Sequence, residues 1–273
     1  MQLRDQEKEI LDGKHGEARR MALSILVDLG ELFGAEEMMA VSQVHIDSSI
    51  YMVDAGLEFV ERFAELGAKV AVPTSLNPSA IDLERWKEYR VPPELLDKSR
   101  RMERAYLKMG VTPTWTCAPY QQGLIPRFGE QIAWGESNAI AFANSIIGAR
   151  TNRYGDLMDV CASLVGRVPR FGLHLPVNRR AELLIRLTGV TDEMFEDRGI
   201  YPLLGFLVGE MAGDRVVAIE GIPQSVEMDS LKGFCAAIAS SGAVALFHLV
   251  GVTPEAQTLE MCLQGTKLKE VLE

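Results

Sequence analysis

The chain has few cysteines for its length, and no two of them stand close together. Its 273 residues include four cysteines, and no pair has the CxxC spacing of a self-contained zinc or cluster site. Thiols so widely spread argue against a disulfide framework and are expected to be reduced. A metal would therefore have to collect its ligands from distant segments or from another chain. The four cysteines are Cys117, Cys161, Cys235 and Cys262.

Long apolar runs and clusters of basic residues are also lacking. No stretch approaches the roughly 20 apolar residues that cross a bilayer, and the charged start MQLRDQEKEILDGKHGE is unlike a signal peptide. The formal net charge is -10 and Lys and Arg are not clustered, which disfavours a nucleic-acid partner. We therefore expect a cytoplasmic protein that binds neither membrane nor nucleic acid.

The residues that are present suit a folded protein, since 47% are hydrophobic and 24% are charged. Apolar residues recur at helical spacing over 16–32, 54–67, 93–109, 136–147, 156–165, 179–187 and 228–239. Extended apolar segments at 39–46, 69–73, 215–219 and 243–250 are typical of strands. This alternation predicts an α/β fold with mostly parallel sheet. The prediction is a single region, 1–273, with a sub-boundary near 166–178, where glycine and proline cluster.

The first stretch of unusual polarity, Thr74-Ser75-Leu76-Asn77, follows the predicted strand at 69–73. Ligands of open parallel sheets bind outside the carboxyl ends of strands, so hydroxyls and an amide there are placed to hold a small polar ligand. The alternative is an Asn-Pro turn with local bonds from side chain to backbone.

Cys117 lies in a second stretch, between Thr116 and Ala118, without helical periodicity. A thiol in such a loop suits a metal ligand. It also suits a nucleophile, which would need a base such as His45 or His248. The third reading is a buried structural cysteine that packs as a small hydrophobe.

The third stretch carries Glu136, Ser137 and Asn138 at a predicted helix start, and 150–153 just after the predicted helix end at Gly148. Unpaired N–H groups at a helix start attract an anion, and an arginine can hold a carboxylate through two parallel hydrogen bonds. We therefore expect a substrate carboxylate to dock between the helix start and this turn. The alternative assigns the polar residues to helix capping and the arginines to the surface.

His248 lies toward the end of the predicted strand at 243–250, placed to face the same sheet edge as Thr74 and Asn77. The alternative is a core histidine whose hydrogen bonds are satisfied. Glu255, which follows Thr253-Pro254, is either an acid–base group or part of the first turn of the next helix.

Taken together and in this order, these stretches resemble the signature of the aconitase X family. The resemblance extends over nearly the whole chain. The motifs that carry it are Gly13-Lys14-His15-Gly16-Glu17, Gln43-Val44-His45-Ile46, Thr74-Ser75-Leu76-Asn77, Thr116-Cys117-Ala118-Pro119-Tyr120, Trp134-Gly135-Glu136-Ser137-Asn138-Ala139, Phe142-Ala143-Asn144-Ser145, Gly148-Ala149-Arg150-Thr151-Asn152-Arg153 and Gly251-Val252-Thr253-Pro254-Glu255-Ala256.

The resemblance implies an aconitase-like layered fold with helices on both faces of the sheet. It implies a hydro-lyase that removes water from a small hydroxy acid, cis-3-hydroxy-L-proline first, with mevalonate 5-phosphate as the alternative. An iron or iron–sulfur centre would act as a Lewis acid on the departing hydroxyl, with Cys117 as a ligand. The substrate-binding candidates are Thr74, Ser75, Asn77, Ser137, Asn138, Ser145, Arg150, Thr151, Asn152 and Arg153. The catalytic candidates are His45, Ser75, Glu136 and His248.

The chain departs from the family pattern in two places. Ser75 stands where members commonly have threonine, a change that keeps the hydroxyl. The family's large subunit usually continues past Thr253-Pro254-Glu255-Ala256 into a segment with two further cysteine ligands, and the other three cysteines of this chain do not match those motifs. We therefore expect an incomplete ligand set, with the missing cysteines either on another chain or in a lost part of the gene, and a small subunit that closes over the cleft.

Two other functions compete with the dehydratase. One is a non-catalytic subunit that binds a small acid without metal. The other is a cysteine hydrolase built on Cys117 and a histidine. Cys161 and Cys235 fall within helical patterns, which suits core packing better than metal ligation.

Overall fold

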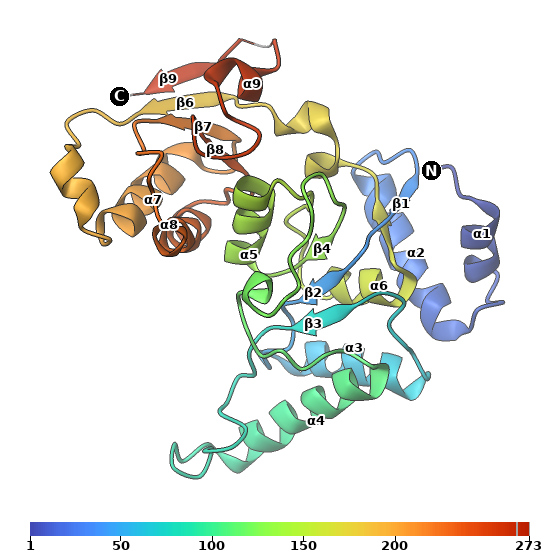
Figure 1. Ribbon diagram of the computed structural model, residues 1–273. Helices are drawn as coiled ribbons and strands as arrows, with labels where there is room; N and C mark the ends of the chain where they lie inside the picture. Colours follow the sequence, from blue (N-terminus) through green and yellow to red (C-terminus); the bar gives the residue numbers. More distant parts are fainter. Residues whose placement is uncertain (266, 273) are drawn as a thin grey trace. The chain divides into compact units, whose positions relative to one another are not determined.

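The computed structural model describes residues 1–265 and 267–272, so Thr266 and Glu273 lie outside the described part (Figure 1). The chain divides into two compact units, each assembled from separate stretches of sequence. The first unit comprises Met1–Ile125, Gln131–Glu136 and Tyr154–Phe171, and the second comprises Pro126–Glu130, Ser137–Arg153 and the chain from Gly172 onward.

The first unit combines helices with two small sheets. Its helices are α1 (Asp5–Leu11), α2 (Glu17–Leu32), α3 (Asp54–Glu65), α4 (Pro93–Met109) and α6 (Met158–Val165), with a short 3-10 turn η1 (Pro119–Gln121). Its strands are β1 (Met38–Ala40), β2 (Val44–Ile46), β3 (Thr74–Leu76), β4 (Ala133–Trp134) and β5 (Arg167–Pro169). Strands β3, β2 and β4 form a parallel sheet in that order, whereas β1 and β5 form an antiparallel pair.

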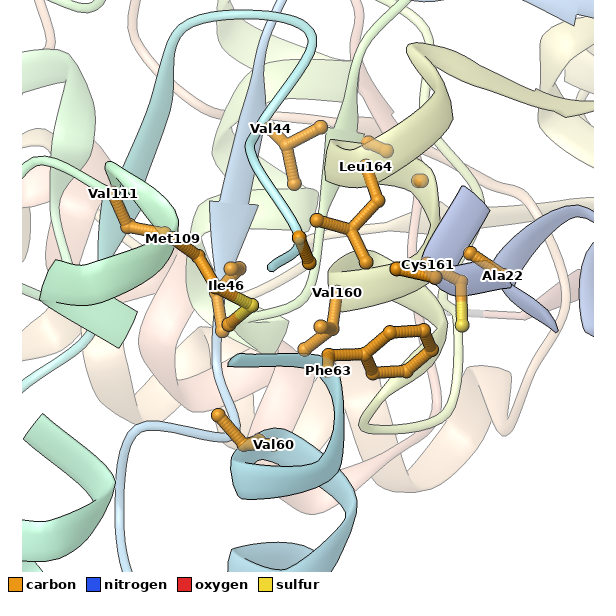
Figure 2. Packing of buried hydrophobic residues seen from close by; sticks show 14 of the residues in the cluster. Ala22, Val44, Ile46, Val60, Phe63, Met109, Val111, Val160, Cys161 and Leu164 are labelled. Atoms are coloured by element: carbon orange, nitrogen blue, oxygen red, sulfur yellow. The ribbon is translucent and has the colours of Figure 1, made fainter. Parts of the chain in front are cut away.

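The core of the first unit surrounds the parallel sheet. Helix α3 packs on α4, and α2 packs on α6, which in turn contacts β2 and β4. Figure 2 shows how Ile46 of β2, Phe63 of α3 and Val160 of α6 meet in this core, all of them at most 1% exposed. Cys161 is also fully buried there, as the helical pattern around it predicts. A rigid core of this kind holds the ends of the three parallel strands in place.

The second unit is built on one fully parallel sheet with the strand order β8-β7-β6-β9. Its strands are β6 (Leu183–Arg186), β7 (Val217–Glu220), β8 (Phe247–Leu249) and β9 (Glu270–Leu272). Its helices are α5 (Ser137–Phe142), α7 (Ile200–Ala212), α8 (Met228–Ser241) and α9 (Leu259–Leu263), with a π-helical turn η2 (Ala143–Ile147) and the 3-10 turns η3 (Gly172–His174), η4 (Pro176–Arg179) and η5 (Asp192–Glu196). Helices α7 and α8 lie on one side of the sheet and α9 on the other (Figure 1).

The sequence predicts the fold class and most helices correctly. An α/β fold with parallel sheets and helices on both faces of a sheet is confirmed, and α4 begins and ends where its pattern does, closed by Gly110 at φ 89°. The predicted strand at 39–46 is two strands, β1 and β2, which belong to different sheets. Among the helices of the described residues, none combines the length and apolar character that a bilayer span requires.

Two sequence predictions are wrong, and each has a physical reason. Residues 179–187 are predicted as a helix but contain strand β6, because Leu183, Leu184 and Ile185 form an apolar run buried on both faces of a parallel sheet, which spacing alone cannot distinguish from a buried helix. Residues 69–73 are predicted as a strand, yet pairing begins at Thr74. The N–H groups of Val70 and Ala71 instead donate to carbonyls of α4 and α6.

Candidate functional site

The ends of the three parallel strands of the first unit bring polar side chains together. Asp47 follows β2, Asn77 follows β3, and Glu136 comes two residues after β4. Because parallel strands end at the same edge of a sheet, their following residues converge there. We call Asp47, Asn77, Glu136 and the nearby Asp159 of α6 the acidic cluster.

His45 hydrogen-bonds to the Asn77 side chain and so fixes its position. In the register of β2 and β3 it lies opposite Ser75, and its Nδ1 is 2.8 Å from Ser75 Oγ while its Nε2 is 3.0 Å from Asn77 Oδ1. An amide oxygen only accepts hydrogen bonds, so Nε2 carries the hydrogen and Nδ1 accepts from the Ser75 hydroxyl. Burial lowers the pKa of His45 to about 4. The ring is therefore neutral at pH 7, and both of its nitrogens are occupied.

Asn77 in turn holds two carboxylates with its amide nitrogen. Its Nδ2 donates to Asp47 Oδ1 and, at 2.5 Å, to Glu136 Oε2. Asn77 itself is fully buried. The chain of contacts from Ser75 through His45 and Asn77 thus sets the position of two acids at the sheet edge.

Asp159 completes the cluster from helix α6. Its Oδ2 accepts the backbone N–H of Asp47 at 2.8 Å. Burial, followed by the negative charges of Glu136, Asp156 and Asp159, raises the pKa of Asp47 to about 7, and burial raises the pKa of Asp159 to about 7 as well. The cluster therefore holds or releases a proton close to neutral pH.

Gly135 allows the carboxylates to approach the backbone this closely. A Cβ atom added at Gly135 would lie 2.4 Å from Asp159 Oδ2 and 2.9 Å from the Cβ of Asp47. Neither neighbour can yield without moving the cluster, so any larger residue would displace it. The Trp134-Gly135-Glu136 motif is thus explained by close approach at the cluster.

Cys117 lies beside the acidic cluster and is half-buried. Burial, together with the charges of Glu136 and Asp47, raises the pKa of its thiol to about 11. The other three cysteines are fully buried. Over residues 1–265 and 267–272, no group of three or more His, Cys, Asp and Glu side chains has an arrangement that would hold a metal ion. These residues therefore supply one half-buried thiol and not a complete ligand set for iron or a cluster.

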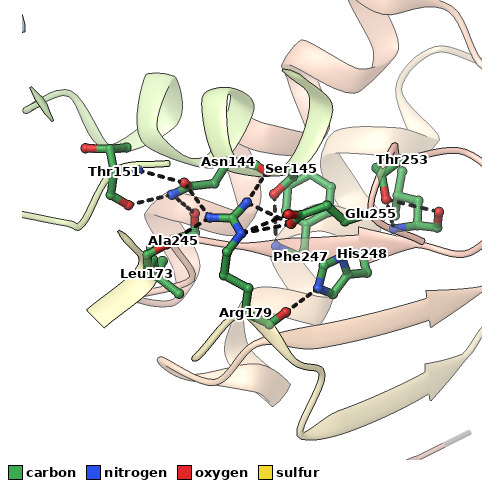
Figure 3. A network of polar contacts seen from close by, with 11 residues as sticks. Asn144, Ser145, Thr151, Leu173, Arg179, Ala245, Phe247, His248, Thr253 and Glu255 are labelled. Carbon is green, nitrogen blue, oxygen red and sulfur yellow. Dashed lines mark hydrogen bonds and ion pairs between the residues drawn. The ribbon is translucent and has the colours of Figure 1, made fainter. Parts of the chain in front are cut away.

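In the second unit a buried arginine organises the other motif residues (Figure 3). The side chain of Arg179 is 1% exposed. Its Nε lies 2.9 Å and its Nη2 2.8 Å from Oε2 of Glu255. Its Nη1 donates to Asn144 Oδ1 at 3.0 Å, and its Nη2 donates to the Asn144 carbonyl at 2.9 Å. A buried charge needs such a full set of partners.

Asn144 also hydrogen-bonds to the turn at 150–153 and so connects it to Arg179. Its Nδ2 donates to the Thr151 carbonyl at 2.9 Å, and its Oδ1 accepts the Thr151 N–H at 3.0 Å. Asn152 Oδ1 accepts the Leu173 N–H at 2.6 Å. Asn144 belongs to the π-helical turn η2, a feature that is frequent at functional sites.

The sequence-predicted residues therefore fall into two groups. The structure gathers His45, Ser75, Asn77, Cys117 and Glu136 around the sheet edge of the first unit, with Thr74 buried beside them and bonded to the Val72 carbonyl. The remaining candidates belong to the second unit. They are Ser137, Asn138, Ser145, Arg150, Thr151, Asn152, Arg153 and His248.

Several of the second group make structural bonds. Ser145 Oγ accepts the Phe247 N–H at 2.9 Å, and His248 Nε2 donates to the Arg179 carbonyl at 2.7 Å. Arg153 is exposed, with one contact of 3.4 Å to the Gly242 carbonyl. In contrast, Asn138 Oδ1 and Arg150 Nε are buried atoms without a hydrogen-bond partner in the described part of the chain. Within this group, these two are the buried side-chain atoms whose hydrogen-bonding capacity is unused by the described residues.

Sequence reasoning missed Asp47, Asp159 and Arg179. Asp47 was within reach, because it directly follows the Gln43-Val44-His45-Ile46 motif at the end of a predicted strand. Asp159 and Arg179 gave no such signal. The first lies inside a helical pattern, and the second lies in a segment predicted to be the wrong kind of element.

Comparison with known proteins identifies the family. The model of the aconitase X first domain matches residues 1–177, and that of the aconitase X second domain matches 181–273. The chain belongs to the aconitase X family. This family member is 44% identical over 267 residues to a cis-3-hydroxy-L-proline dehydratase of Pseudomonas aeruginosa, which covers 97% of the chain and 46% of that protein.

Other relatives of this aconitase X chain include archaeal proteins. It is 38% identical to a phosphomevalonate dehydratase large subunit of Methanocaldococcus jannaschii, over 96% of the chain and 66% of that protein. The crystal structure of Thermococcus kodakaraensis aconitase X in its holo-form superposes with a TM-score of 0.88 at 36% identity, covering 100% of the chain and 66% of that structure. The chain thus spans about half the length of the bacterial relative and just under two thirds of the archaeal ones.

Proposed function

We propose that this chain is the large subunit, or most of one, of a hydro-lyase that removes water from a small hydroxylated carboxylic acid. The observation that carries the proposal is the acidic cluster, where Asn77 holds two carboxylates and the pKa of Asp47 is raised to about 7. A carboxyl group that titrates near neutral pH can both take and give a proton. The relatives' names, which are those of dehydratases, support the reaction class.

Elimination of water requires a base at the carbon next to the hydroxyl and an acid that assists departure of the hydroxyl. We assign proton transfer to Asp47 and Glu136, whose oxygens share one amide donor and so lie side by side. His45 and Ser75 then act as positioning residues, because both ring nitrogens of His45 are already bonded. His248, bonded to the Arg179 carbonyl and 1% exposed, suits the same kind of role in the second unit.

An iron or iron–sulfur centre, when bound, would supply a Lewis acid to the departing hydroxyl. Cys117 is the ligand that we propose from this chain, since it is the cysteine that is not fully buried. The described residues do not complete a ligand set. We therefore propose that the remaining ligands come from a segment or chain outside them, and that a small subunit completes the enzyme, as the name of the Methanocaldococcus relative implies for that protein. The proposed compartment is the cytoplasm.

The substrate proposed first is cis-3-hydroxy-L-proline, and mevalonate 5-phosphate is the alternative, following the names of the relatives. In the second unit, Arg150 Nε supports carboxylate binding, because it is a buried donor with no partner among the described residues. Asn138 Oδ1, likewise buried, would accept a hydroxyl or ammonium hydrogen of the substrate. Ser137 and the turn at 151–153 complete the set of residues that we propose to bind the substrate.

To test this, the chain is purified anaerobically together with any co-purifying subunits and is incubated with cis-3-hydroxy-L-proline or with mevalonate 5-phosphate. NMR then follows the loss of water from each acid. We expect one of the two to lose water. Replacement Asp47→Asn should lower kcat by about 100-fold or more, the usual contribution of a positioned acid–base group. Asp28→Asn, an exposed carboxylate on α2, is the matched control and should leave kcat unchanged. Turnover that survives Asp47→Asn would reject the assignment of Asp47, and binding without turnover of either acid would favour the non-catalytic alternative.

A further inference from the structure

A second site lies in the second unit and shares no residue with the acidic cluster. A cavity of about 300 Å³ opens between the loop that follows β6 and the loop that follows β7. Both loops leave the carboxyl ends of neighbouring parallel strands, the position at which open α/β sheets bind ligands. Its volume is at the lower end of the range for small-molecule sites.

The hydroxyl groups of two largely buried residues line this cavity without a protein partner. Tyr201 and Ser230 are each 5% exposed, and no other described residue hydrogen-bonds to either hydroxyl. Neither hydroxyl oxygen is among the solvent-inaccessible unbonded atoms of the described residues, so both are open to the cavity they line and are placed to meet a group that enters it. Burial and the nearby charge of Glu227 raise the pKa of Tyr201, which keeps its phenol protonated.

The charge around the cavity is predominantly negative. Asp192, Glu196 and Glu227 line it together with a single cation, Arg198. Arg198 is already paired with Glu227, whereas Asp192 and Glu196 form no ion pair with any described residue. Two uncompensated carboxylates therefore face the same small space. They repel anions and attract a cation.

Aromatic rings form part of the wall. The rings of Phe195 and Tyr201 lie 5.7 Å apart between centroids and are inclined by 42°, and both line the cavity. Aromatic faces beside carboxylates are the chemistry that recognises alkylammonium and quaternary ammonium groups, because the ring face is electrostatically negative and the carboxylate adds full charge. Among the described residues, no group of three or more His, Cys, Asp and Glu side chains is arranged to hold a metal ion, and an uncharged apolar ligand would leave the carboxylates uncompensated.

We propose that this cavity binds a small organic cation through its ammonium group. The aromatic pair contacts the carbon atoms around the nitrogen, Asp192 and Glu196 supply the charge, and the hydroxyls of Tyr201 and Ser230 bond to polar atoms elsewhere on the ligand. This inference does not depend on the dehydratase proposal, because it concerns different residues on a different sheet.

The probes are choline chloride and its uncharged isostere 3,3-dimethylbutan-1-ol, titrated into the full chain by calorimetry at constant ionic strength near 0.1 M, so that screening is the same throughout. Choline should bind in a saturable manner, and the isostere about tenfold or more weakly, because it lacks the charge that both carboxylates and rings recognise. Glu196→Gln and Phe195→Leu should each weaken choline binding by about threefold or more.

Glu193→Gln is the matched control, since Glu193 belongs to the same 3-10 turn η5 but does not line the cavity. It should leave choline binding unchanged, and circular dichroism should show that every variant is folded. The proposal is overturned if the isostere binds as tightly as choline, if Glu193→Gln weakens binding as much as Glu196→Gln does, or if choline shows no saturable binding.

Discussion

At the scale of single residues, Asp159 is a carboxyl group whose burial raises its pKa to about 7 from an ordinary value of 3.8. Between these two pH values the folded protein keeps a proton that the unfolded chain has lost, so stability falls as the pH rises from about 4 to 7. We predict that Asp159→Asn, which keeps the shape and one acceptor oxygen, stabilises the fold at pH 8 by on the order of 2 kcal/mol. Below pH 4 the difference should vanish.

Urea unfolding of both proteins at pH 8 and at pH 3.5 would measure this effect. Asp28→Asn on the exposed side of α2 is the control and should change stability little at either pH. A variant that is less stable than the parent at pH 8 would contradict the prediction, because it would show that the bonds from the backbone N–H groups of Asp47 and Val160 to Asp159 outweigh its buried charge.

Arg150 and Arg153 are three residues apart but stand in different surroundings. Arg150 is half-buried with an unpaired Nε, whereas Arg153 is exposed. If Arg150 holds the substrate carboxylate, Arg150→Lys should weaken binding of a substrate-like acid about tenfold, since the planar fork is lost while the charge stays. Arg153→Lys should change it much less. Calorimetry with proline analogues that keep the 2-carboxylate measures the affinity of both variants. A larger loss of affinity in Arg153→Lys than in Arg150→Lys would show that Arg153 holds the carboxylate.

At the scale of elements, the π-helical turn η2, the 3-10 turn η4 and the loop after β8 are joined through Arg179, Asn144 and Glu255. We predict that Arg179→Met destabilises the protein by roughly 3–5 kcal/mol, because it leaves the Glu255 carboxylate, only 13% exposed, without its partner. The double variant Arg179→Met/Glu255→Leu should lose clearly less than the sum of the two single changes.

Arg180→Met is the matched control for this network. Arg180 is the next residue along the chain, but among the described residues its side chain reaches only Gln264, at 3.4 Å, so its loss should cost little. Denaturant titrations of Arg179→Met, Glu255→Leu, the double variant and Arg180→Met measure the free energy of unfolding of each. Additive losses in the double variant would mean that Arg179 and Glu255 stabilise the unit independently.

Helices α7 and α8 pack closely because glycine lies at their contact. A Cβ atom at Gly209 would lie 2.1 Å from Ser241 Oγ and 2.8 Å from the Ile238 carbonyl, whereas one at Gly233 would meet nothing closer than 3.6 Å. Gly209→Ala should therefore destabilise the protein by about 1–3 kcal/mol through overpacking. Gly233→Ala, by the gain in helix propensity, should stabilise it by up to about 1 kcal/mol. Thermal unfolding of both would test this, and equal effects would mean that the helices can separate freely.

At the scale of the whole molecule, the chain covers less than half of its bacterial relative and 66% of the archaeal structure. We predict that the chain purified alone shows no dehydration of cis-3-hydroxy-L-proline or mevalonate 5-phosphate, since elimination requires closure that excludes water. If the proposed small subunit and iron centre are present, Cys117→Ser should lower the iron content of the assembled protein, whereas Cys161→Ala should not, because Cys161 is buried in the core.

Iron and sulfide analysis of anaerobically purified protein measures this prediction independently of turnover. Loss of iron in Cys161→Ala with an intact circular dichroism spectrum would show that the ligand is misassigned. Full turnover by the isolated chain would show that the described residues form a complete site.

The amino-acid sequence by itself determined the fold class, most helix boundaries and the family. Those features depend on local signals: apolar spacing, left-handed glycines such as Gly110 and Gly148 at helix ends, and motifs that can be read residue by residue. The sequence also pointed to His45, Ser75, Asn77 and Glu136, because each follows or lies within a predicted strand or motif.

Only the tertiary structure decided what those residues do together. Asp47 and Asp159 are 112 positions apart along the chain. Their pKa values are raised by burial first and then by neighbouring carboxylates, among them Asp156 for both residues, and neither effect exists before the chain folds. The same holds for Arg179, whose partners come from three separate segments, and for strand β6, whose apolar run fits a helix equally well until neighbouring strands pair with it. Local signals act within a few residues, whereas burial, charge coupling and strand pairing act between segments that only folding brings together.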